Sequence, residues 1–482
     1  MRDIELISLI EDAISLRTEM GNIEFKKAKS GVPENLYDTF SSFSNTSGGI
    51  IVFGIDESND YEVCGIENVD FFQKKIVEQA LMMEPKIRPV ITICEYKGRT
   101  IVVAEIAELD AFSKPCYYLG KGKMKGSYIR VGDADLPMTD YEIYSYDAFK
   151  YKTEDELRSK DRVSADILNE VSINAFLDKI TTLKPNMINL DSKSILKMSG
   201  ILDNNGIPTI CGIMNFGKYP QIFAPNLDIV AVKCASDKYG LENSDGVRFL
   251  DNKRLDGTIA DMLKMSISFV ASNIKKATRI NSQGDREDIL EYPMKAIREI
   301  ILNALIHRDY SIHTENEPIR LTIYEDRLEV TNPGGLYGRL TIDELGKTRA
   351  DIRNPFIAST LETLEITENR YSGVPTIYAE MKKAGLLEPK FENERGVFKV
   401  TLYNSLKKNV VNDDFVEKIK KFCKVPRSKE AIAKFFGYDE KHPAYFIRSR
   451  VLPLIEKGIL GYTIVDKPKS KNQKIYTIEQ DI

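Results

Sequence analysis

The sequence predicts an α+β protein built from several domains. Its 482 residues are enough for about three or four domains of the usual ~100 to 200 residues each. Apolar residues recur at helical spacing in some stretches and form short runs bounded by glycine in others, which favours a mixture of helices and strands. Charge is divided unevenly, because residues 407–482 carry 17 basic and 10 acidic side chains although the whole chain has a net charge of −4. We therefore expect a basic tail of net +7 that meets a polyanion, on a body of net −11.

Composition excludes several classes of protein. The six cysteines include no Cys-x-x-Cys pair, which argues against zinc and a disulfide framework and for a reducing compartment. No apolar run approaches the ~18 residues of a membrane span, and the chain begins with a charged amphipathic helix rather than a signal peptide. We therefore expect a cytoplasmic protein without membrane contact.

The first domain is expected over residues 1–138, with an α+β order of elements. Periodicity and turn residues predict helices at 4–15, 36–43 and 72–82, and strands at 19–26, 50–56, 91–106 (a hairpin) and 128–132. The short motifs are Glu24-Phe25-Lys26, Phe43-Ser44-Asn45-Thr46-Ser47-Gly48-Gly49, Gly54-Ile55-Asp56, Lys114-Pro115 and Tyr128-Ile129-Arg130-Val131-Gly132. In this order they resemble the Schlafen AlbA-type domain, which implies a DNA-binding module.

Three carboxylates of this domain allow two interpretations. Similarity to the Schlafen ribonucleases implies that Glu19, Glu24 and Asp56 hold Mg²⁺ or Mn²⁺, which would activate water against a phosphodiester of RNA. Alternatively, Glu24 forms a structural ion pair and Asp56 caps a turn.

A local basic cluster could contact phosphates. Its members include Lys121, Lys123 and Arg130, which we predict as nucleic-acid-binding residues. Residues 1–150 as a whole hold 17 basic and 25 acidic side chains, so binding by the whole face of the domain is not expected. A solvated loop is the alternative for this cluster.

The middle of the chain contains a linker and a connecting region. Residues 139–162 are rich in charge and tyrosine, and we expect a helical linker there. The region 163–289 alternates helices with strands at Cys211–Phe216 and Asp228–Lys233. We assign no chemistry to this region. It mounts the following module and can supply a dimer surface, so a homo-oligomer stays open.

The most informative stretch lies within residues 290–406 and runs from Ala296 to Leu336. Apolar residues at helical spacing predict an amphipathic helix, and Glu299 and Asn303, four residues apart, share one of its faces. A carboxylate there can orient a water, and an amide oxygen can ligate Mg²⁺ beside a phosphate. Two strand-like runs follow, and the second ends in Asn332-Pro333-Gly334-Gly335, where the glycines let the backbone pass close to a ligand.

These residues resemble the GHKL ATPase superfamily, in the branch with the RecG-type carboxy-terminal ATP-binding domain. The resemblance implies an α/β sandwich in which Glu299 is the water-orienting acid of an ATPase and Asn303 ligates the Mg²⁺ that accompanies ATP. The residues predicted to bind the nucleotide are Asn303, His307, Asn332, Gly334, Gly335 and Gly373. His307, one helical turn beyond Asn303, could touch phosphate or form a hydrogen bond within the pocket wall.

The central domain also departs from this family's pattern. Asn332 stands where an adenine-binding Asp is expected, and only Gly373 remains of a glycine-richer phosphate loop. Binding of ATP is therefore better supported than its hydrolysis. A domain that keeps the fold and has lost ATP is the alternative.

Residues 410–482 predict a winged helix. Helices are expected at 415–423, 428–436 and 444–457, with Ser428 as an N-cap, and strands at 460–465 and 474–478 flank a basic hairpin tip. The DNA contacts predicted on the third helix and the wing are Tyr445, Arg448, Arg450, Lys467, Lys469 and Lys471. Winged helices also dock proteins, but the charge of the tail favours DNA.

The sequence as a whole predicts a DNA-binding transcriptional regulator whose conformation is biased by ATP. The alternative is a Schlafen-like metal-dependent endoribonuclease that cuts RNA such as tRNA, with phage defence as a setting. A scaffold with neither activity is a third interpretation.

Overall fold

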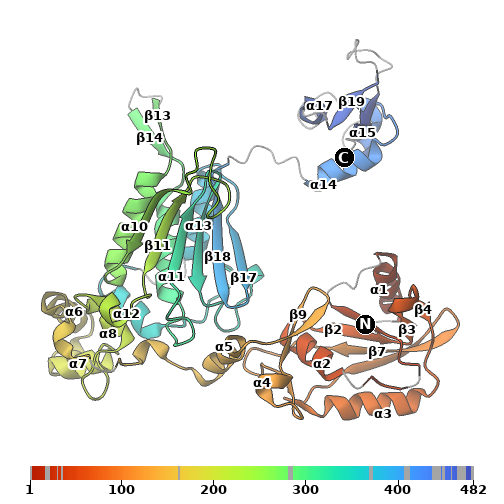
Figure 1. Ribbon diagram of the computed structural model, residues 1–482, viewed down its shortest axis with the longest axis horizontal. Helices are drawn as coiled ribbons and strands as arrows, with labels where there is room; N and C mark the ends of the chain where they lie inside the picture. Colours follow the sequence, from red (N-terminus) through yellow and green to blue (C-terminus); the bar gives the residue numbers. More distant parts are fainter. Residues whose placement is uncertain are drawn as a thin grey trace. The chain divides into compact units, whose positions relative to one another are not determined.

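The computed structural model describes most of the chain. The described residues are 3–16, 22–29, 31–33, 36–160, 163–280, 286–367, 373–405, 413–436, 447, 451–456, 459–463 and 474–478. The chain divides into two compact units, Met1–Asn404 and Ser405–Ile482, and their elements are labelled in Figure 1. Within the described residues, no helix is both long and apolar enough to cross a membrane.

The first unit begins with a four-stranded sheet of order β1-β2-β7-β6, in which β1 and β2 are parallel and the other pairs antiparallel. Its strands are β1 (Ile23–Lys26), β2 (Gly49–Phe53), β6 (Val90–Tyr96) and β7 (Arg99–Ile106). Shorter strands accompany it: β3 (Ile55–Asp56), β4 (Glu62–Val63), β5 (Met83–Glu84), β8 (Tyr117–Tyr118), β9 (Tyr128–Val131) and β10 (Ala134–Pro137). The helices are α1 (Asp3–Leu16), α2 (Leu36–Asn45), α3 (Val69–Ala80) and α4 (Lys123–Gly126). These elements confirm the predicted α+β character of this part of the chain.

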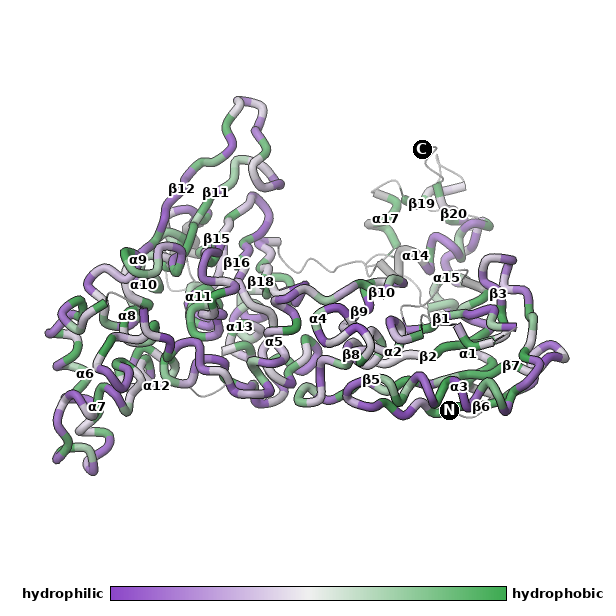
Figure 2. The backbone as a smooth tube through the Cα atoms, turned by 60° about the horizontal axis from the view of Figure 1, so that its bottom comes forward, coloured by the Kyte–Doolittle hydropathy of each residue, from purple (hydrophilic) through white to green (hydrophobic). Residues whose placement is uncertain are grey.

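Both faces of this sheet are covered. Alternate residues of β2 contribute to two hydrophobic clusters, one shared with α2 and α3 and the other with α1. Figure 2 shows the hydrophobic colour along β2 and β7. A strand buried on both faces reads as a continuous apolar run, which explains why this strand was recognisable from the sequence.

The linker and the first half of the connecting region are mainly helical. Their helices are α5 (Asp140–Tyr151), α6 (Glu170–Leu183), α7 (Ser192–Met198), α8 (Ile210–Phe216) and α9 (Pro220–Phe223). Residues Cys211–Phe216 were expected to form a strand and are instead helical. Thr209 caps this helix by accepting a hydrogen bond from the backbone N–H of Gly212, and every residue of α8 is buried. A short run buried all round has no periodicity, so the pattern could not separate helix from strand.

A six-stranded mixed sheet forms the rest of the first unit, with order β12-β11-β15-β16-β18-β17. Its strands are β11 (Ile229–Cys234), β12 (Phe249–Leu255), β15 (Ile319–Ile323), β16 (Arg327–Pro333), β17 (Lys390–Glu394) and β18 (Val397–Tyr403). The associated helices are α10 (Ile259–Asn273), α11 (Met294–His307), α12 (Pro355–Thr363) and α13 (Gly373–Lys383). A separate hairpin is made by β13 (Lys276–Ile280) and β14 (Arg286–Leu290). Helix α11 packs against the sheet and against α10 and α13, and its apolar stripe lies in the largest hydrophobic cluster.

The second unit contains α14 (Asp413–Phe422), α15 (Lys429–Phe435), α17 (Leu452–Glu456) and the antiparallel pair of β19 (Leu460–Tyr462) with β20 (Ile475–Thr477). Ser428 caps α15 through a hydrogen bond from Ala431 N, as predicted. The helices and strands share one hydrophobic cluster. The predicted basic tip and half of the predicted third helix lie outside the described residues, so the winged helix stays a prediction.

Candidate functional site

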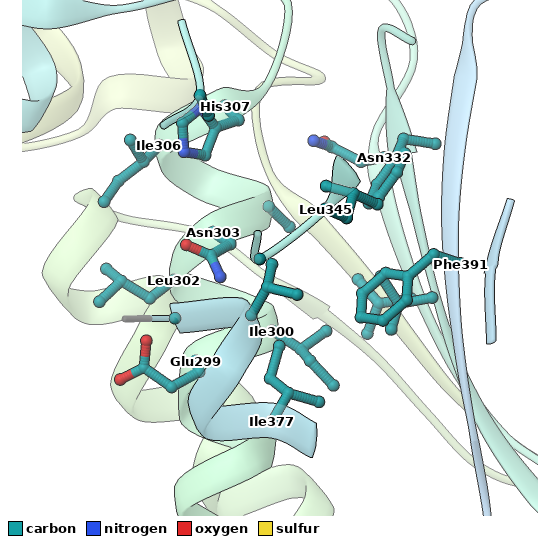
Figure 3. A pocket seen from close by; sticks show the side chains of 18 of the residues that line it. Glu299, Ile300, Leu302, Asn303, Ile306, His307, Asn332, Leu345, Ile377 and Phe391 are labelled. Atoms are coloured by element: carbon teal, nitrogen blue, oxygen red, sulfur yellow. The ribbon is translucent and has the colours of Figure 1, made fainter. Parts of the chain in front are cut away.

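A cavity of about 500 Å³ lies between α11, the sheet and α13. Figure 3 shows Glu299, Asn303 and His307 along α11, with Asn332 and Phe391 on the facing strands. The cavity is lined by the predicted water-orienting acid Glu299 and by every nucleotide-binding residue predicted in the central domain: Asn303, His307, Asn332, Gly334, Gly335 and Gly373. The fold therefore brings this predicted set together around one space, although it does not by itself identify the ligand.

Helix α11 supplies one wall of the cavity with residues spaced by four. Glu299, Asn303 and His307 follow this spacing, and so does Lys295, which also lines the cavity. Sequence reasoning missed Lys295, although extending the same spacing one turn towards the N-terminus would have found it. Arg298 lines the cavity as well and donates a hydrogen bond to the backbone carbonyl of Ile366, at 2.7 Å.

One end of the cavity is formed by Glu299, Asn303 and the first residue of α13. A Cβ built on Gly373 would lie 2.7 Å from Asn303 Nδ2 and 3.2 Å from Glu299 Oε2, so a side chain at this position would displace the end of the Asn303 side chain. Helix α13, which is 11 residues long, begins at this point with Gly373. Free N–H groups and the helix dipole favour negative charge at a helix N-terminus, and Lys295 and Arg298 add positive charge to the same wall.

The other end is formed by Asn332 and the glycine turn that follows β16. Asn332 is 5% exposed, and its Oδ1 has no hydrogen-bond partner among the described residues. A buried acceptor without a partner costs about 1–3 kcal/mol, which a ligand that donates a hydrogen bond would recover. Gly334 has φ +102°, and a Cβ there would lie 2.6 Å from Asp309 Cβ. Glycine is therefore required at Gly334 both by its backbone conformation and by this close contact.

Two buried polar residues hold this glycine turn. The guanidinium of Arg353 donates from Nη2 to the carbonyl of Gly335, at 2.9 Å, and its Nη1 lies 3.3 Å from Asp309 Oδ2. Burial disfavours ionisation of Asp309, but the charge of Arg353 and hydrogen bonds from Ser311 and Tyr141 outweigh it and lower the pKa of Asp309. The sequence analysis did not predict a role for Arg353 or Asp309.

His307 is neutral in this environment. Burial, and then the charge of Arg353, lower its pKa to about 4. Near neutral pH its side chain can therefore offer a hydrogen bond to a ligand but not a positive charge.

The predicted carboxylates of the first domain are paired with cations. Glu24 is 8% exposed and contacts Arg130 Nη2 at 2.9 Å and Lys26 Nζ at 2.5 Å. Asp56 Oδ2 contacts Lys27 Nζ at 2.6 Å, and this hydrogen bond, followed by one from Ser58, lowers the pKa of Asp56. In the part of the chain that the structure describes, no three His, Cys, Asp or Glu side chains are grouped as metal ligands. Glu19 lies outside the described residues.

The three predicted basic residues of this domain also have intramolecular partners. Lys121 contacts Asp38 Oδ1 and the hydroxyl of Tyr128, both at 3.0 Å, and Lys123 contacts Asp147 at 2.9 Å. Arg130 differs from them because it is buried, with Asp135 and Glu24 each 2.9 Å from its guanidinium. The guanidinium of Arg130 therefore faces the interior, whereas Lys121 and Lys123 reach the surface.

The residues predicted on the tail cannot be placed in this way. Tyr445, Arg448, Arg450, Lys467, Lys469 and Lys471 all lie outside the described residues. They stay predictions from the sequence.

Comparison with family models identifies two parts of the chain. Residues 19–139 match the model "Schlafen, AlbA_2", and residues 316–402 match the model described as "Putative ATP-dependent DNA helicase recG C-terminal". Both resemblances inferred from the sequence are thereby confirmed. Residues 19–139 are thus similar to a Schlafen AlbA-type domain and residues 316–402 to a RecG-type carboxy-terminal domain, and the two similarities together support nucleic-acid binding and nucleotide binding. The second match begins beyond α11, so Glu299 and Asn303 lie outside it.

Two solved structures resemble the chain. The DIP2311 protein from Corynebacterium diphtheriae is 19% identical, with 93% of each chain covered and a TM-score of 0.40. The N-terminal domain of a RecG-related protein from Nitrosomonas europaea is 27% identical over 27% of this chain and 90% of that domain, with a TM-score of 0.22. The search of curated proteins gave no match.

Proposed function

We propose that the protein is a nucleic-acid-binding regulator that binds ATP with Mg²⁺ in the cavity beside α11. The cavity carries this proposal because its two ends have complementary chemistry. One end offers Asn303, Glu299, Lys295 and the N-terminus of α13 to a magnesium triphosphate, and the other offers the unpartnered Oδ1 of Asn332 to the amino group of a base.

The residues present fit a metal that arrives with the nucleotide. Mg²⁺ prefers oxygen ligands and keeps several waters, so one protein oxygen beside the phosphates is enough. Asn303 would supply that oxygen. Because the described residues contain no group of three candidate ligands, we expect Mg²⁺ alone to bind weakly. Glu299 is the side chain that would orient water if the nucleotide is hydrolysed.

A thermal-shift titration of the wild type and Asn303→Ala with ATP, ADP and Mg²⁺ tests this site. Ligand at ~100 times its Kd stabilises the folded state by about 2.7 kcal/mol, which raises the Tm measurably. We expect a shift for the wild type with ATP and Mg²⁺, and its loss in Asn303→Ala. Asn59→Ala, an exposed Asn outside the cavity, is the matched control and should keep the shift. Absence of a shift in the wild type would refute nucleotide binding.

DNA is the proposed nucleic acid, bound through the first domain and the basic tail as a winged helix. Replacing Lys467, Lys469 and Lys471 together by Ala should weaken DNA binding and reduce the slope of log affinity against log salt by about 0.9 for each phosphate that the variant no longer neutralises. Fluorescence anisotropy with labelled duplex DNA at several salt concentrations measures both. An unchanged slope would count against the assignment of these lysines to a wing. If RNA of equal length binds more tightly than the duplex DNA, RNA is the partner instead of DNA.

Binding rather than cleavage is proposed for the first domain. Glu24 and Asp56 are each neutralised by a basic side chain, which leaves their charge less available to a metal ion. Incubation with tRNA and Mn²⁺ or Mg²⁺ should therefore leave the RNA intact. Cleavage that disappears in Glu24→Ala would establish the ribonuclease instead.

A further inference from the structure

Helix α5, which follows the first domain in the chain, contacts the residues that support the cavity wall. The hydroxyl of Tyr141 donates a hydrogen bond to Asp309 Oδ2, at 2.8 Å. Its ring packs against Gly396, where a Cβ would lie 2.7 Å from Tyr141 Cδ1. Tyr141 lies outside the central domain predicted at 290–406, yet it binds one of the two buried residues behind the glycine turn.

The contacts continue from Asp309 to the cavity itself. Asp309 pairs with Arg353 at 3.3 Å, and Arg353 in turn holds the carbonyl of Gly335 at 2.9 Å. The guanidinium of Arg353 also lies 5.1 Å from the centre of the Tyr337 ring. Gly335 and Tyr337 both line the cavity. Three consecutive polar contacts therefore connect Tyr141 to the wall that a bound nucleotide would touch.

A second set of contacts joins α5 to the same wall through aromatic rings. The rings of Phe149 and Tyr337 are 5.3 Å apart in an edge-to-face arrangement. The ring centre of Phe149 also lies 4.5 Å from that of Phe112, which belongs to the first domain. Asp147 of α5 binds Lys123 of that domain at 2.9 Å. Helix α5 thus has one group of contacts with the cavity wall and another with the first domain.

We propose that Tyr141 is a positioning residue of the cavity and that α5 couples nucleotide binding to nucleic-acid binding by the first domain. The inference rests on the proposed function. A nucleotide that shifts the segment from Gly334 to Tyr337 must also shift Arg353, Asp309 and Phe149, because these side chains are packed against that segment. Coupling of this kind is reciprocal, so nucleic acid changes the affinity for ATP by the same factor as ATP changes the affinity for nucleic acid.

The test measures the Kd of the full chain for a labelled nucleic acid with and without saturating ATP and Mg²⁺. We expect the wild-type ratio of the two Kd values to differ from one by at least about fivefold, within the usual range for coupled sites. Tyr141→Phe keeps the ring and removes only the hydroxyl, so its ratio should move close to one. Tyr151→Phe changes an exposed tyrosine of the same helix and should keep the wild-type ratio. The Kd for ATP, measured with and without saturating nucleic acid, must change by the same factor for each protein.

The outcomes separate this inference from the function on which it rests. Failure of the wild type to bind ATP or nucleic acid at all would overturn the proposed function and the coupling together. Binding of both ligands with a ratio of one would overturn the coupling alone, as would a wild-type ratio in Tyr141→Phe. Circular dichroism confirms that the variant is folded. If Tyr141→Phe unfolds, Phe149→Leu takes its place, because leucine keeps an apolar side chain near Phe112 and Tyr337. Its ratio of the two Kd values is also expected to move close to one.

Discussion

The first domain and the cavity beside α11 differ in whether their buried polar side chains have partners. In the first domain the predicted carboxylates Glu24 and Asp56 have cations within hydrogen-bonding distance. In the cavity, Asn332 is even more buried than Glu24, yet its Oδ1 has no partner among the described residues. Buried polar groups in stable proteins are almost always satisfied. The paired carboxylates of the first domain therefore stabilise the fold. The Oδ1 of Asn332 is instead suited to accept a hydrogen bond from a ligand.

The presence or absence of a partner distinguishes residues that look equally functional in the sequence. A carboxylate surrounded by basic side chains resembles a catalytic acid until its partners are seen. Removing one partner of a satisfied pair should damage the fold, whereas removing an unsatisfied group should damage only binding. The following variants test this distinction, beginning with the largest expected effect.

Arg130→Ala should destabilise the first domain strongly. The guanidinium lies between Glu24 and Asp135, each at 2.9 Å, and all three side chains are largely buried. Deleting one partner of a buried ion pair typically costs about 3–5 kcal/mol, because it leaves uncompensated charge inside the protein. Urea unfolding followed by circular dichroism measures the loss. A change below ~1 kcal/mol would show that the network is not structural.

Glu156 represents a third arrangement, a buried carboxylate held by backbone N–H groups. It accepts hydrogen bonds from the N–H groups of Phe356, at 2.9 Å, and Ile357, at 2.7 Å, at the start of α12. Burial raises its pKa from 4.5 to about 7, although these two hydrogen bonds oppose the shift. Between about pH 4.5 and 7 the folded chain therefore binds more protons at Glu156 than the unfolded chain. As a result, the free energy of unfolding falls as pH rises through this window, by an amount on the order of 3 kcal/mol.

Glu156→Gln should remove this contribution. His307 has the opposite effect on stability, because its folded pKa of about 4 lies below its usual 6.5 and stability is lost as pH falls between these values. The difference between wild type and Glu156→Gln at each pH cancels the contribution of His307. We expect this difference to change steadily from pH 5 to pH 7 and to be flat above pH 8. A difference that is constant throughout would contradict the raised pKa.

Much of the cavity could be predicted from the sequence because its signals are local. Glu299 and Asn303 stand one turn apart on a helix, and the glycines after Asn332 mark a close backbone approach. What supports these residues could not be predicted. Tyr141 and Asp309 are 168 positions apart, and no local pattern connects them.

The exposure of one residue and the secondary structure of one segment were predicted wrongly, for physical reasons. Arg130 belongs to a run with basic neighbours and was expected on the surface, because a sequence records charge and not the two carboxylates that draw a guanidinium inward. Residues Cys211–Phe216 were expected as a strand because a fully buried seven-residue helix has no polar face. Local periodicity thus predicts elements that have one exposed face and fails where tertiary burial is complete.

Asn332→Ala should weaken nucleotide binding without weakening the fold. The substitution removes an acceptor that has no described partner and leaves space that is continuous with the cavity. A hydrogen bond to a ligand is worth about 0.5–1.5 kcal/mol, so the Kd for ATP should rise by up to about tenfold while the Tm without ligand changes little. Isothermal titration calorimetry measures the Kd.

Asn215→Ala is the matched control for this variant. Asn215 is also buried, and its Oδ1 has no partner in the part of the chain that the structure describes. It does not line the cavity, however, and its Nδ2 donates to the carbonyl of Cys211 at 2.9 Å. This control should lower the Tm and leave the Kd for ATP unchanged. An equal rise in Kd for both variants would mean that Asn332 acts through the stability of the fold rather than through contact with the ligand.

Lys121→Ala should have the smallest effect on stability and tests whether the paired cations of the first domain have a function beyond the fold. Lys121 is partly exposed, and its contact with Asp38 resembles surface ion pairs that contribute about 0.2–1 kcal/mol. If nucleic acid displaces Asp38 from this lysine, the variant should bind more weakly, and its salt slope should fall by about one. Lys75→Ala, which breaks an exposed pair with Glu78 in the same domain, should change neither affinity nor slope. Equal affinities and slopes for the two variants would place Lys121 with Arg130 among the residues that serve only the fold.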